Sequence, residues 1–151
     1  MTISIRKTYK FEAAHYLPGH NGKCSNLHGH SYVLEVELTG TLVSRTDASD
    51  FLMVTDFHDL DSIVKPLIET RLDHKDLNET LKEFIPRTTA EGMVIFIAAH
   101  IKALLPEHLS LTEVVVWETA TSRAIWRGQV CDTWHNHTQP VSTLPETESN
   151  G

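Results

Sequence analysis

Three histidines fall in a pattern that suits a metal ion. His28 and His30 stand two apart at the start of residues 29–43, where apolar and polar residues alternate. Residues two apart on a β-strand point to the same face, so both imidazoles can reach one ion. His15 follows another alternating segment, residues 2–14, and lies beside His28 if the two segments pair antiparallel. Three imidazoles with no fourth protein ligand in view are typical of an open catalytic zinc site.

A cysteine lies close to this pattern. Cys24 stands four residues before His28, in a loop over residues 16–27 that is rich in proline, glycine and asparagine. The spacing leaves three roles open for Cys24. It is either a fourth ligand, or a thiol near the metal with a lowered pKa that lets it move protons, or an inert loop cysteine. Spacing alone also leaves open that the three histidines are unrelated loop residues.

Further polar residues stand at the ends of predicted elements. Asp73 and His74 follow a helix, where the carboxylate can orient the imidazole and hold its proton; the alternative is a solvated helix end. Glu118 ends an apolar strand and either pairs two N–H donors of a ligand or is a surface charge. Thr88 and Thr89 are predicted as helix caps and as exposed donors at a helix N-terminus, where a ligand can bind.

Hydrophobic periodicity predicts the elements that must position these residues. Period-two alternation or short apolar runs predict four strands, at residues 2–14, 29–43, 111–118 and 123–130. Apolar positions three or four apart predict two helices, one from the Asp56 cap to about Leu72 with a kink at Pro66, the other over 89–105 with a capping box at Thr88–Glu91. The order ββααββ predicts an α+β domain with both helices on one face of a four-stranded antiparallel sheet.

The third predicted strand indicates that the sheet needs a partner. Val114 and Val116 point to one side, and Val115 and Trp117 point to the other. A strand that is apolar on both faces is buried on both faces, whereas two helices cover only one side of the sheet. We therefore expect a second copy of the chain to cover the other side.

Composition limits the class of protein. The 151 residues suit one domain, which we assign to residues 1–131, followed by a tail over 132–151 that is predicted to be disordered. A net charge of −7 argues against generic binding to nucleic acid or anionic membranes. Two cysteines cannot build a disulfide framework, and no signal-peptide-like or membrane-spanning apolar run is present, so a cytoplasmic location is expected.

Several motifs together point to one family. They are FEAAHYLP (11–18), CSNLHGHSY (24–32), VTDFHDL (54–60), LDHKDLN (72–78), TTAE (88–91) and VWET (116–119). With these motifs the sequence resembles the 6-pyruvoyl-tetrahydropterin synthase family. The C-x-x-x-H-x-H spacing from Cys24 to His30 resembles the branch that forms 6-carboxytetrahydropterin for queuosine biosynthesis.

The resemblance implies a fold, an assembly and a set of roles. It implies a tunnelling fold (T-fold), in which three subunits close their sheets into a barrel, two trimers stack as a hexamer, and active sites lie between subunits. The implied metal ligands are His15, His28 and His30, which would bind one zinc ion. Cys24 would be the general base or proton shuttle, with Asp73 and His74 as its relay. Glu118 would anchor the pterin, and Thr88 and Thr89 would add further pterin contacts.

The resemblance also implies a reaction. A zinc-dependent lyase of this kind would convert 7,8-dihydroneopterin triphosphate to 6-carboxy-5,6,7,8-tetrahydropterin, acetaldehyde and triphosphate. The alternatives are a pyruvoyl-forming or dihydroneopterin-cleaving activity of the same family, or a non-catalytic zinc- or pterin-binding module. Lys23, Arg87 and Arg123 are the candidates for holding the triphosphate.

Overall fold

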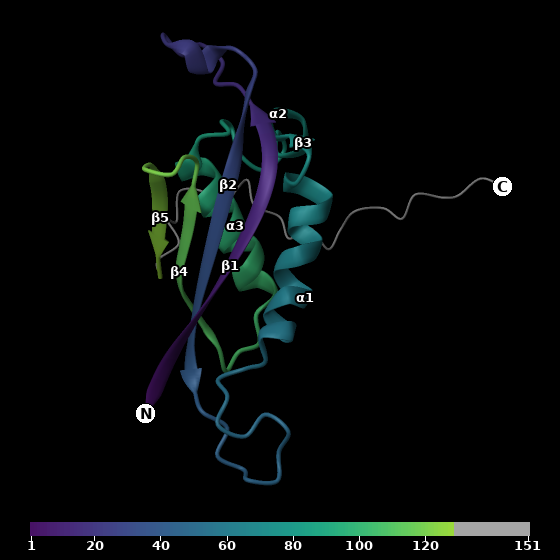
Figure 1. Cartoon of the computed structure of the whole chain (residues 1–151), viewed down its shortest axis with the longest axis vertical. Helices are drawn as coiled ribbons and strands as arrows, with labels where there is room; N and C mark the ends of the chain where they lie inside the picture. The colour runs from purple at the N-terminus through teal and green to yellow at the C-terminus, as the bar shows by residue number, and fades with distance from the viewer. Residues whose placement is uncertain (129–151) are drawn as a thin grey trace, which may run out of the picture.

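A five-stranded sheet with helices on one side forms the fold of the computed structural model, which describes residues 1–128 (Figure 1). The strands lie in the order β3-β1-β2-β4-β5. Their bounds are β1 Thr2–His15, β2 His28–Thr41, β3 Lys75–Asp76, β4 Ser110–Trp117 and β5 Arg123–Arg127. The helices are α1 Phe57–Leu67, α2 Leu77–Thr80 and α3 Ala90–Leu104. The predicted tail over 132–151 lies outside the described residues. Within residues 1–128, no helix is long and apolar enough to span a membrane.

The predicted antiparallel strands are confirmed, and one strand is added. β1 and β2 pair antiparallel over their full length, and this register sets His15 opposite His28. β2 pairs with β4 and β4 with β5, both antiparallel. The addition is β3, which runs parallel to β1 and makes the sheet five-stranded rather than four-stranded. Its two residues are too few to show a hydrophobic period, which is why the sequence did not reveal it.

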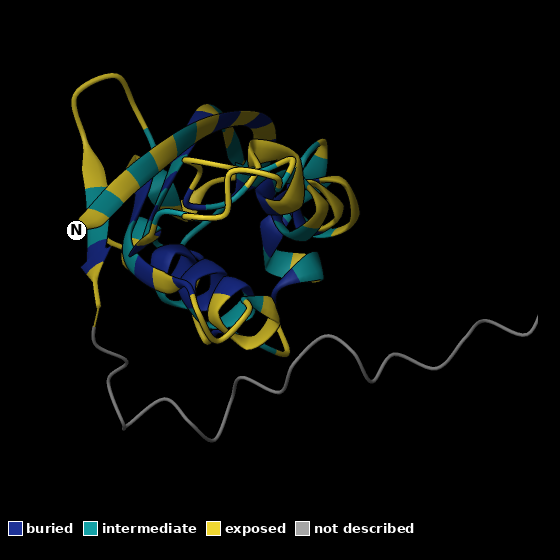
Figure 2. Ribbon diagram, turned by 90° about the horizontal axis from the view of Figure 1, so that it is seen from below, coloured by how far each residue is buried: buried dark blue, intermediate teal, exposed yellow. Residues whose placement is uncertain are grey.

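Alternation along β1 and β2 builds the core. Tyr9, Phe11 and Ala13 of β1 are buried on the helix-facing side, and Tyr32 and Leu34 of β2 are buried beside them. Buried positions of α3 complete this layer: Met93, Val94, Phe96, Ile97 and Ile101. Figure 2 shows the alternating exposure along the strands and the buried face of α3 turned toward the sheet. The sheet and helices therefore share one core, and the histidines at the ends of β1 and β2 lie at its rim.

Lys7 interrupts the apolar positions of β1 without exposing them. Its ammonium lies 2.7 Å from the carboxylate of Asp61 on α1, and Lys65 reaches the same carboxylate at 2.8 Å. The hydroxyl of Tyr9 donates to Asp61 as well, at 3.1 Å. Hydrogen bonds from Lys65, then from Lys7, hold the pKa of Asp61 at about 2. Lys7 therefore joins β1 to α1 through a shared carboxylate.

Both predicted helices form, with changes at their ends. Asp56 caps α1 as expected, accepting from the backbone N–H of His58 at 2.8 Å. The α-helix ends just after Pro66, and a π-helical turn, Ile68–Leu72, carries the chain to Asp73. This change of helix type agrees with the predicted kink, since proline cannot donate a backbone hydrogen bond. The four-residue helix α2 was not predicted.

The cap of α3 corrects the sequence-based expectation. The capping-box spacing assigned the cap to Thr88, whereas the structure assigns it to Thr89, whose hydroxyl accepts from the backbone N–H of Gly92 at 3.1 Å. Thr88 turns inward and is only 2% exposed. Its hydroxyl donates to Asn78 at 3.3 Å. A tertiary contact therefore takes Thr88 out of the cap and leaves that role to its neighbour.

The face of the sheet away from the helices carries linked ion pairs. Arg6 lies 2.7 Å from Glu35, 2.8 Å from Glu37 and 2.6 Å from Glu113. Val115 is buried on this face, although it is not part of the main core. Of the two residues predicted to be buried on this face, Val115 is buried and Trp117 is half-buried.

Candidate metal centre and active site

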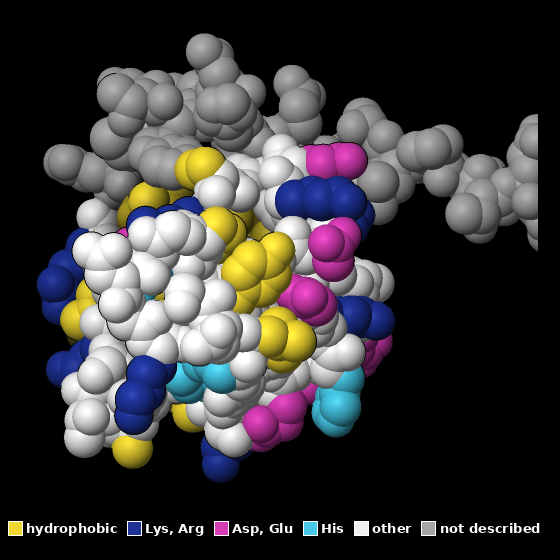
Figure 3. Space-filling model, turned by 90° about the horizontal axis from the view of Figure 1, so that it is seen from above, with side chains coloured by type: hydrophobic (Ala, Val, Ile, Leu, Met, Phe, Trp, Pro, Cys, Tyr) yellow, Lys and Arg dark blue, Asp and Glu magenta, His cyan; other side chains and the backbone are white. Residues whose placement is uncertain are grey.

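The three predicted histidines meet at one end of the sheet. One side-chain nitrogen from each of His15, His28 and His30 lies within 4.8 Å of the others. The β1–β2 register produces this cluster, because it sets His15 opposite His28, and His30 is the next residue of β2 on the same face. In the space-filling view from above, histidine side chains reach the surface at this end of the molecule (Figure 3).

Backbone carbonyls fix how two of the imidazoles present their nitrogens. His15 Nδ1 lies 2.7 Å from the carbonyl oxygen of Thr88, and His28 Nδ1 lies 2.7 Å from that of Asn26. A carbonyl oxygen only accepts, so each Nδ1 is the donor, and the ligand nitrogen that each ring can offer is its Nε2. Such outer hydrogen bonds orient metal-ligating histidines in known metal sites.

The remaining observations test whether a divalent ion fits this group. Nε2 of His15 and Nε2 of His30 are buried and have no hydrogen-bond partner among residues 1–128. Burial lowers the pKa of His30, and the neighbouring histidines lower it further against the opposing charge of Glu118. This shift favours the neutral form of the His30 imidazole, which is the form that binds a metal ion. A group of three imidazoles, two of them with buried nitrogens that have no partner among residues 1–128, fits Zn²⁺ or a similar ion.

Glu118 lies beside these histidines, at the end of β4. Its carboxylate oxygen lies 3.5 Å from His15 Nε2, and its backbone N–H donates to the carbonyl of Ser122 at 3.1 Å. The half-exposed side chain also lines a groove of about 590 Å³ between the ends of β2 and β4. Sequence reasoning placed this carboxylate in a ligand site, and the structure brings it to the histidine cluster and to a groove.

Thr88 differs from its predicted exposed position. It is buried, its carbonyl oxygen holds His15, and its hydroxyl donates to Asn78. Asn78 in turn accepts from the backbone N–H of Tyr16 at 2.9 Å and donates to its carbonyl at 2.8 Å. Thr88 is therefore a support for His15 rather than an exposed donor. The role of Asn78 was missed, although it ends the LDHKDLN motif; Thr89 stays half-buried as the cap of α3.

Cys24 lies in a short 3₁₀ turn, Lys23–Ser25, that closes the loop between β1 and β2. Its carbonyl oxygen accepts from the backbone N–H of Leu17 at 2.7 Å, and the residue is half-buried. The metal-ligating group found within residues 1–128 comprises the three histidines without Cys24. The structure thus favours a neighbouring thiol over a fourth ligand, and its part in proton transfer stays a prediction.

Asp73 and His74 form the predicted pair. Nδ1 of His74 lies 2.9 Å from one carboxylate oxygen of Asp73, while the other oxygen accepts from the backbone N–H of Glu12 at 2.9 Å. The Glu12 hydrogen bond, then the His74 contact, lower the pKa of Asp73. His74 has a left-handed backbone, φ 55°, and its side chain is 78% exposed. The carboxylate is thus fixed to β1 and presents an accessible imidazole.

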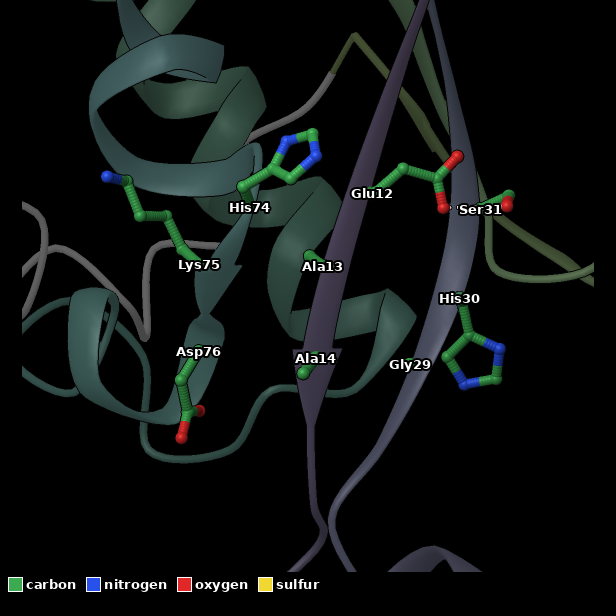
Figure 4. A pocket seen from close by; sticks show the side chains of 9 residues that line it. All are labelled: Glu12, Ala13, Ala14, Gly29, His30, Ser31, His74, Lys75 and Asp76. Atoms are coloured by element: carbon green, nitrogen blue, oxygen red, sulfur yellow. Dashed lines mark hydrogen bonds between the residues drawn. The ribbon is translucent and has the colours of Figure 1, made fainter.

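A second groove, of about 540 Å³, brings His74 and His30 to one surface. Figure 4 shows their rings coming from the two sides of β1 and not pointing toward each other, while Glu12 and Ser31 face one another across β1 and β2. Ser31 donates to Glu12 at 2.7 Å. Both grooves share Gly29–Ser31, and their volumes suit small molecules. The three predicted triphosphate contacts, Lys23, Arg87 and Arg123, line neither groove.

Comparison with known proteins agrees with these observations. The family model described as 6-pyruvoyl tetrahydropterin synthase matches residues 4–129. A protein of Haemophilus influenzae named 6-carboxy-5,6,7,8-tetrahydropterin synthase is 39% identical, over 80% of this chain and 95% of the relative. A Synechocystis protein of the same name is 40% identical, over 80% of this chain and 89% of the relative. The solved structure of Caenorhabditis elegans 6-pyruvoyl tetrahydropterin synthase aligns with a TM-score of 0.72 and 26% identity, over 85% of this chain and 97% of that one.

The match of the family model, residues 4–129, includes all three helices, all but the first two residues of the strands, and every residue of the candidate site. These matches confirm the predicted T-fold and the predicted status of the chain as an enzyme, since the relatives are synthases. The chain belongs to the 6-pyruvoyl tetrahydropterin synthase family.

Proposed function

We propose that this chain is a zinc-dependent carbon–carbon lyase. It converts 7,8-dihydroneopterin triphosphate to 6-carboxy-5,6,7,8-tetrahydropterin, acetaldehyde and triphosphate, as a cytoplasmic step of queuosine biosynthesis. The observation that carries the proposal is the cluster of three histidines with the Glu118 carboxylate beside it. The names of the relatives in Haemophilus influenzae and Synechocystis support the carboxy-forming activity over the pyruvoyl-forming one.

In this proposal the histidine cluster would hold one zinc ion per subunit, which would supply a Lewis acid for the side-chain hydroxyls of the substrate. His15 and His28 would bind it through Nε2, because their Nδ1 atoms are held by carbonyl oxygens. Glu118 accepts two N–H donors from the guanidine-like edge of the pterin, within the groove that it lines. Thr89 adds a contact at the start of α3.

Two groups move protons in this mechanism. The thiolate of Cys24 removes a proton near C6 of the pterin, and His74 returns one on the opposite side of the ring. Asp73 keeps the His74 imidazole oriented through the 2.9 Å contact at Nδ1, which leaves Nε2 for the substrate. Triphosphate elimination and carbon–carbon cleavage both need an acid and a base on the two faces of the ring.

We propose that the complete site forms between subunits of a hexamer built from two trimers. Cys24 lies in the loop between β1 and β2, whereas His74 lies at the β3 edge of the sheet, so the two come from separate elements. The uncovered sheet face and the short edge strands β3 and β5 provide the surfaces for closing a barrel. Mass measurement in solution tests this assembly, and a monomeric, active protein contradicts it.

Product analysis tests the proposed reaction. We expect purified, zinc-loaded protein incubated with 7,8-dihydroneopterin triphosphate to release acetaldehyde and a 6-carboxypterin. A 6-pyruvoyl product would instead assign the pyruvoyl-forming activity. Zinc-loaded protein that binds this compound and forms no product would instead be a binding module. Where the wild type is active, the proposal requires Cys24→Ala to keep zinc and lose turnover.

A further inference from the structure

Tyr32 is a core residue whose hydroxyl lacks a hydrogen-bond partner in the described part of the chain. The residue is 0% exposed, and its hydroxyl makes no hydrogen bond within residues 1–128. A buried polar group left unsatisfied costs about 1–3 kcal/mol, so proteins seldom keep one without a use. Phenylalanine would fill the same space without this cost, since the ring stacks on Phe11 with centroids 4.9 Å apart.

The position of Tyr32 connects its hydroxyl to the candidate site. Tyr32 is the next residue of β2 on the face that carries His30, and its ring packs edge-on to His30 and His15, at centroid distances of 5.5 and 6.1 Å. The β2–β4 register pairs Val33 with Trp117, which sets Tyr32 level with Glu118. Burial, and then the negative charge of Glu118, raise the pKa of the Tyr32 hydroxyl, in agreement with this placement.

Three buried polar atoms with no hydrogen-bond partner among residues 1–128 therefore belong to rings that pack against one another. They are His15 Nε2, His30 Nε2 and the Tyr32 hydroxyl, from residues on the helix-facing side of the sheet, and Glu118 lies 3.5 Å from the first of them. Two of them are acceptors that suit a metal ion, whereas the hydroxyl is a donor that suits an oxygen atom. A ligand that satisfies all three must bring an oxygen to the side of the metal position.

We propose that Tyr32 is a binding residue for a hydroxyl oxygen on the side chain of the pterin ligand, to which it donates a hydrogen bond. This inference rests on the proposed function, because it takes the polyhydroxylated pterin as the ligand of the same site. The hydroxyl of Tyr32 selects ligands that carry an oxygen next to the metal position, while Glu118 holds the ring.

Binding of two probes to zinc-loaded protein tests the proposal. The probes are 7,8-dihydroneopterin, which has the hydroxylated side chain, and 7,8-dihydropterin, which lacks it. We expect Tyr32→Phe to weaken dihydroneopterin binding about three- to tenfold, the loss of one hydrogen bond, and to leave dihydropterin binding unchanged. Equal affinities of wild type and variant for dihydroneopterin, or equal losses for both probes, would overturn the role of Tyr32. No binding of either probe to the wild type would overturn the proposed function as well.

Tyr9→Phe provides the matched control. Tyr9 is also buried on the helix-facing side of β1, but its hydroxyl donates to Asp61 at 3.1 Å, far from the histidines in sequence and on another element. We expect Tyr9→Phe to lower the unfolding temperature and leave both probes bound as in the wild type. Tyr32→Phe should leave the unfolding temperature of the metal-free protein equal or higher. A lower unfolding temperature for Tyr32→Phe would mean that the hydroxyl has a protein partner, and would contradict the proposal.

Discussion

Replacing His28 by alanine should remove the response of the protein to zinc without harming the metal-free fold. The side chain is half-exposed at the start of β2, and within residues 1–128 its one hydrogen bond is to the carbonyl of Asn26. Losing one such bond costs about 0.5–1.5 kcal/mol. The metal-free variant should therefore unfold within a few degrees of the wild type.

The zinc-dependent part of the stability is larger. A ligand that binds only the folded state at a free concentration 100 times its Kd stabilises it by about 2.7 kcal/mol. For a domain of this size, that corresponds to a rise in unfolding temperature of roughly 8–15 °C. Because His28 supplies one of three ligand nitrogens, His28→Ala should lose most of this rise.

Thermal unfolding followed by circular dichroism, with and without zinc, measures both parts. His58→Ala is the matched control, since His58 is an exposed histidine on α1 outside the metal-ligating group. It should keep the full zinc-dependent rise. A His28→Ala protein that keeps the wild-type rise would refute the ligand assignment, and equal losses in the two variants would show that the zinc response does not come from this site.

Two further changes test packing at the start of α3 and the ion pairs that join β1 to α1. Gly92→Ala should lower the free energy of unfolding by about 1–3 kcal/mol, because the added Cβ would lie 2.5 Å from the carbonyl oxygen of Arg87. This loss exceeds the gain from the better helix propensity of alanine. Urea unfolding measures the difference, and a variant that is equally or more stable contradicts this reasoning. The pKa of Asp61 is lower in the folded state than in the unfolded chain, so the ionised carboxylate stabilises the folded protein, by about 1 kcal/mol. This stabilisation is present above pH 4 and is lost as the pH falls through about 2. Asp61→Asn should therefore show a flatter stability between pH 4 and pH 2, and an unchanged slope would contradict the role of the two lysines.

Much of the fold follows from periodicity in the sequence. The alternation in β1 and β2 is long enough to fix their antiparallel register, and that register is what brings His15 to His28. The β3 pairing could not be predicted this way. It depends on the backbone N–H of His74 donating to the carbonyl of Glu12 at 2.6 Å, a contact between residues far apart in sequence.

The site was predictable where chemistry depends on side-chain type and strand spacing, and less so where it depends on the backbone. The carbonyl oxygen that fixes His15 belongs to Thr88. Because every residue has a carbonyl oxygen, this contact cannot be predicted from the type of residue at position 88. What the threonine adds is the hydroxyl that donates to Asn78 and thereby holds that turn against the end of β1.

The two threonines of the TTAE motif have different structural roles. Thr88 supports His15 from the buried side, so it can matter for activity without contacting the ligand, whereas Thr89 caps α3 and is the threonine proposed to contact the pterin. The backbone just before Thr88 lies close to α3, because a Cβ on Gly92 would lie 2.5 Å from the carbonyl oxygen of Arg87. The segment that leads into α3 therefore supports the histidine cluster through the 2.7 Å contact between the carbonyl oxygen of Thr88 and His15 Nδ1, rather than through a further ligand.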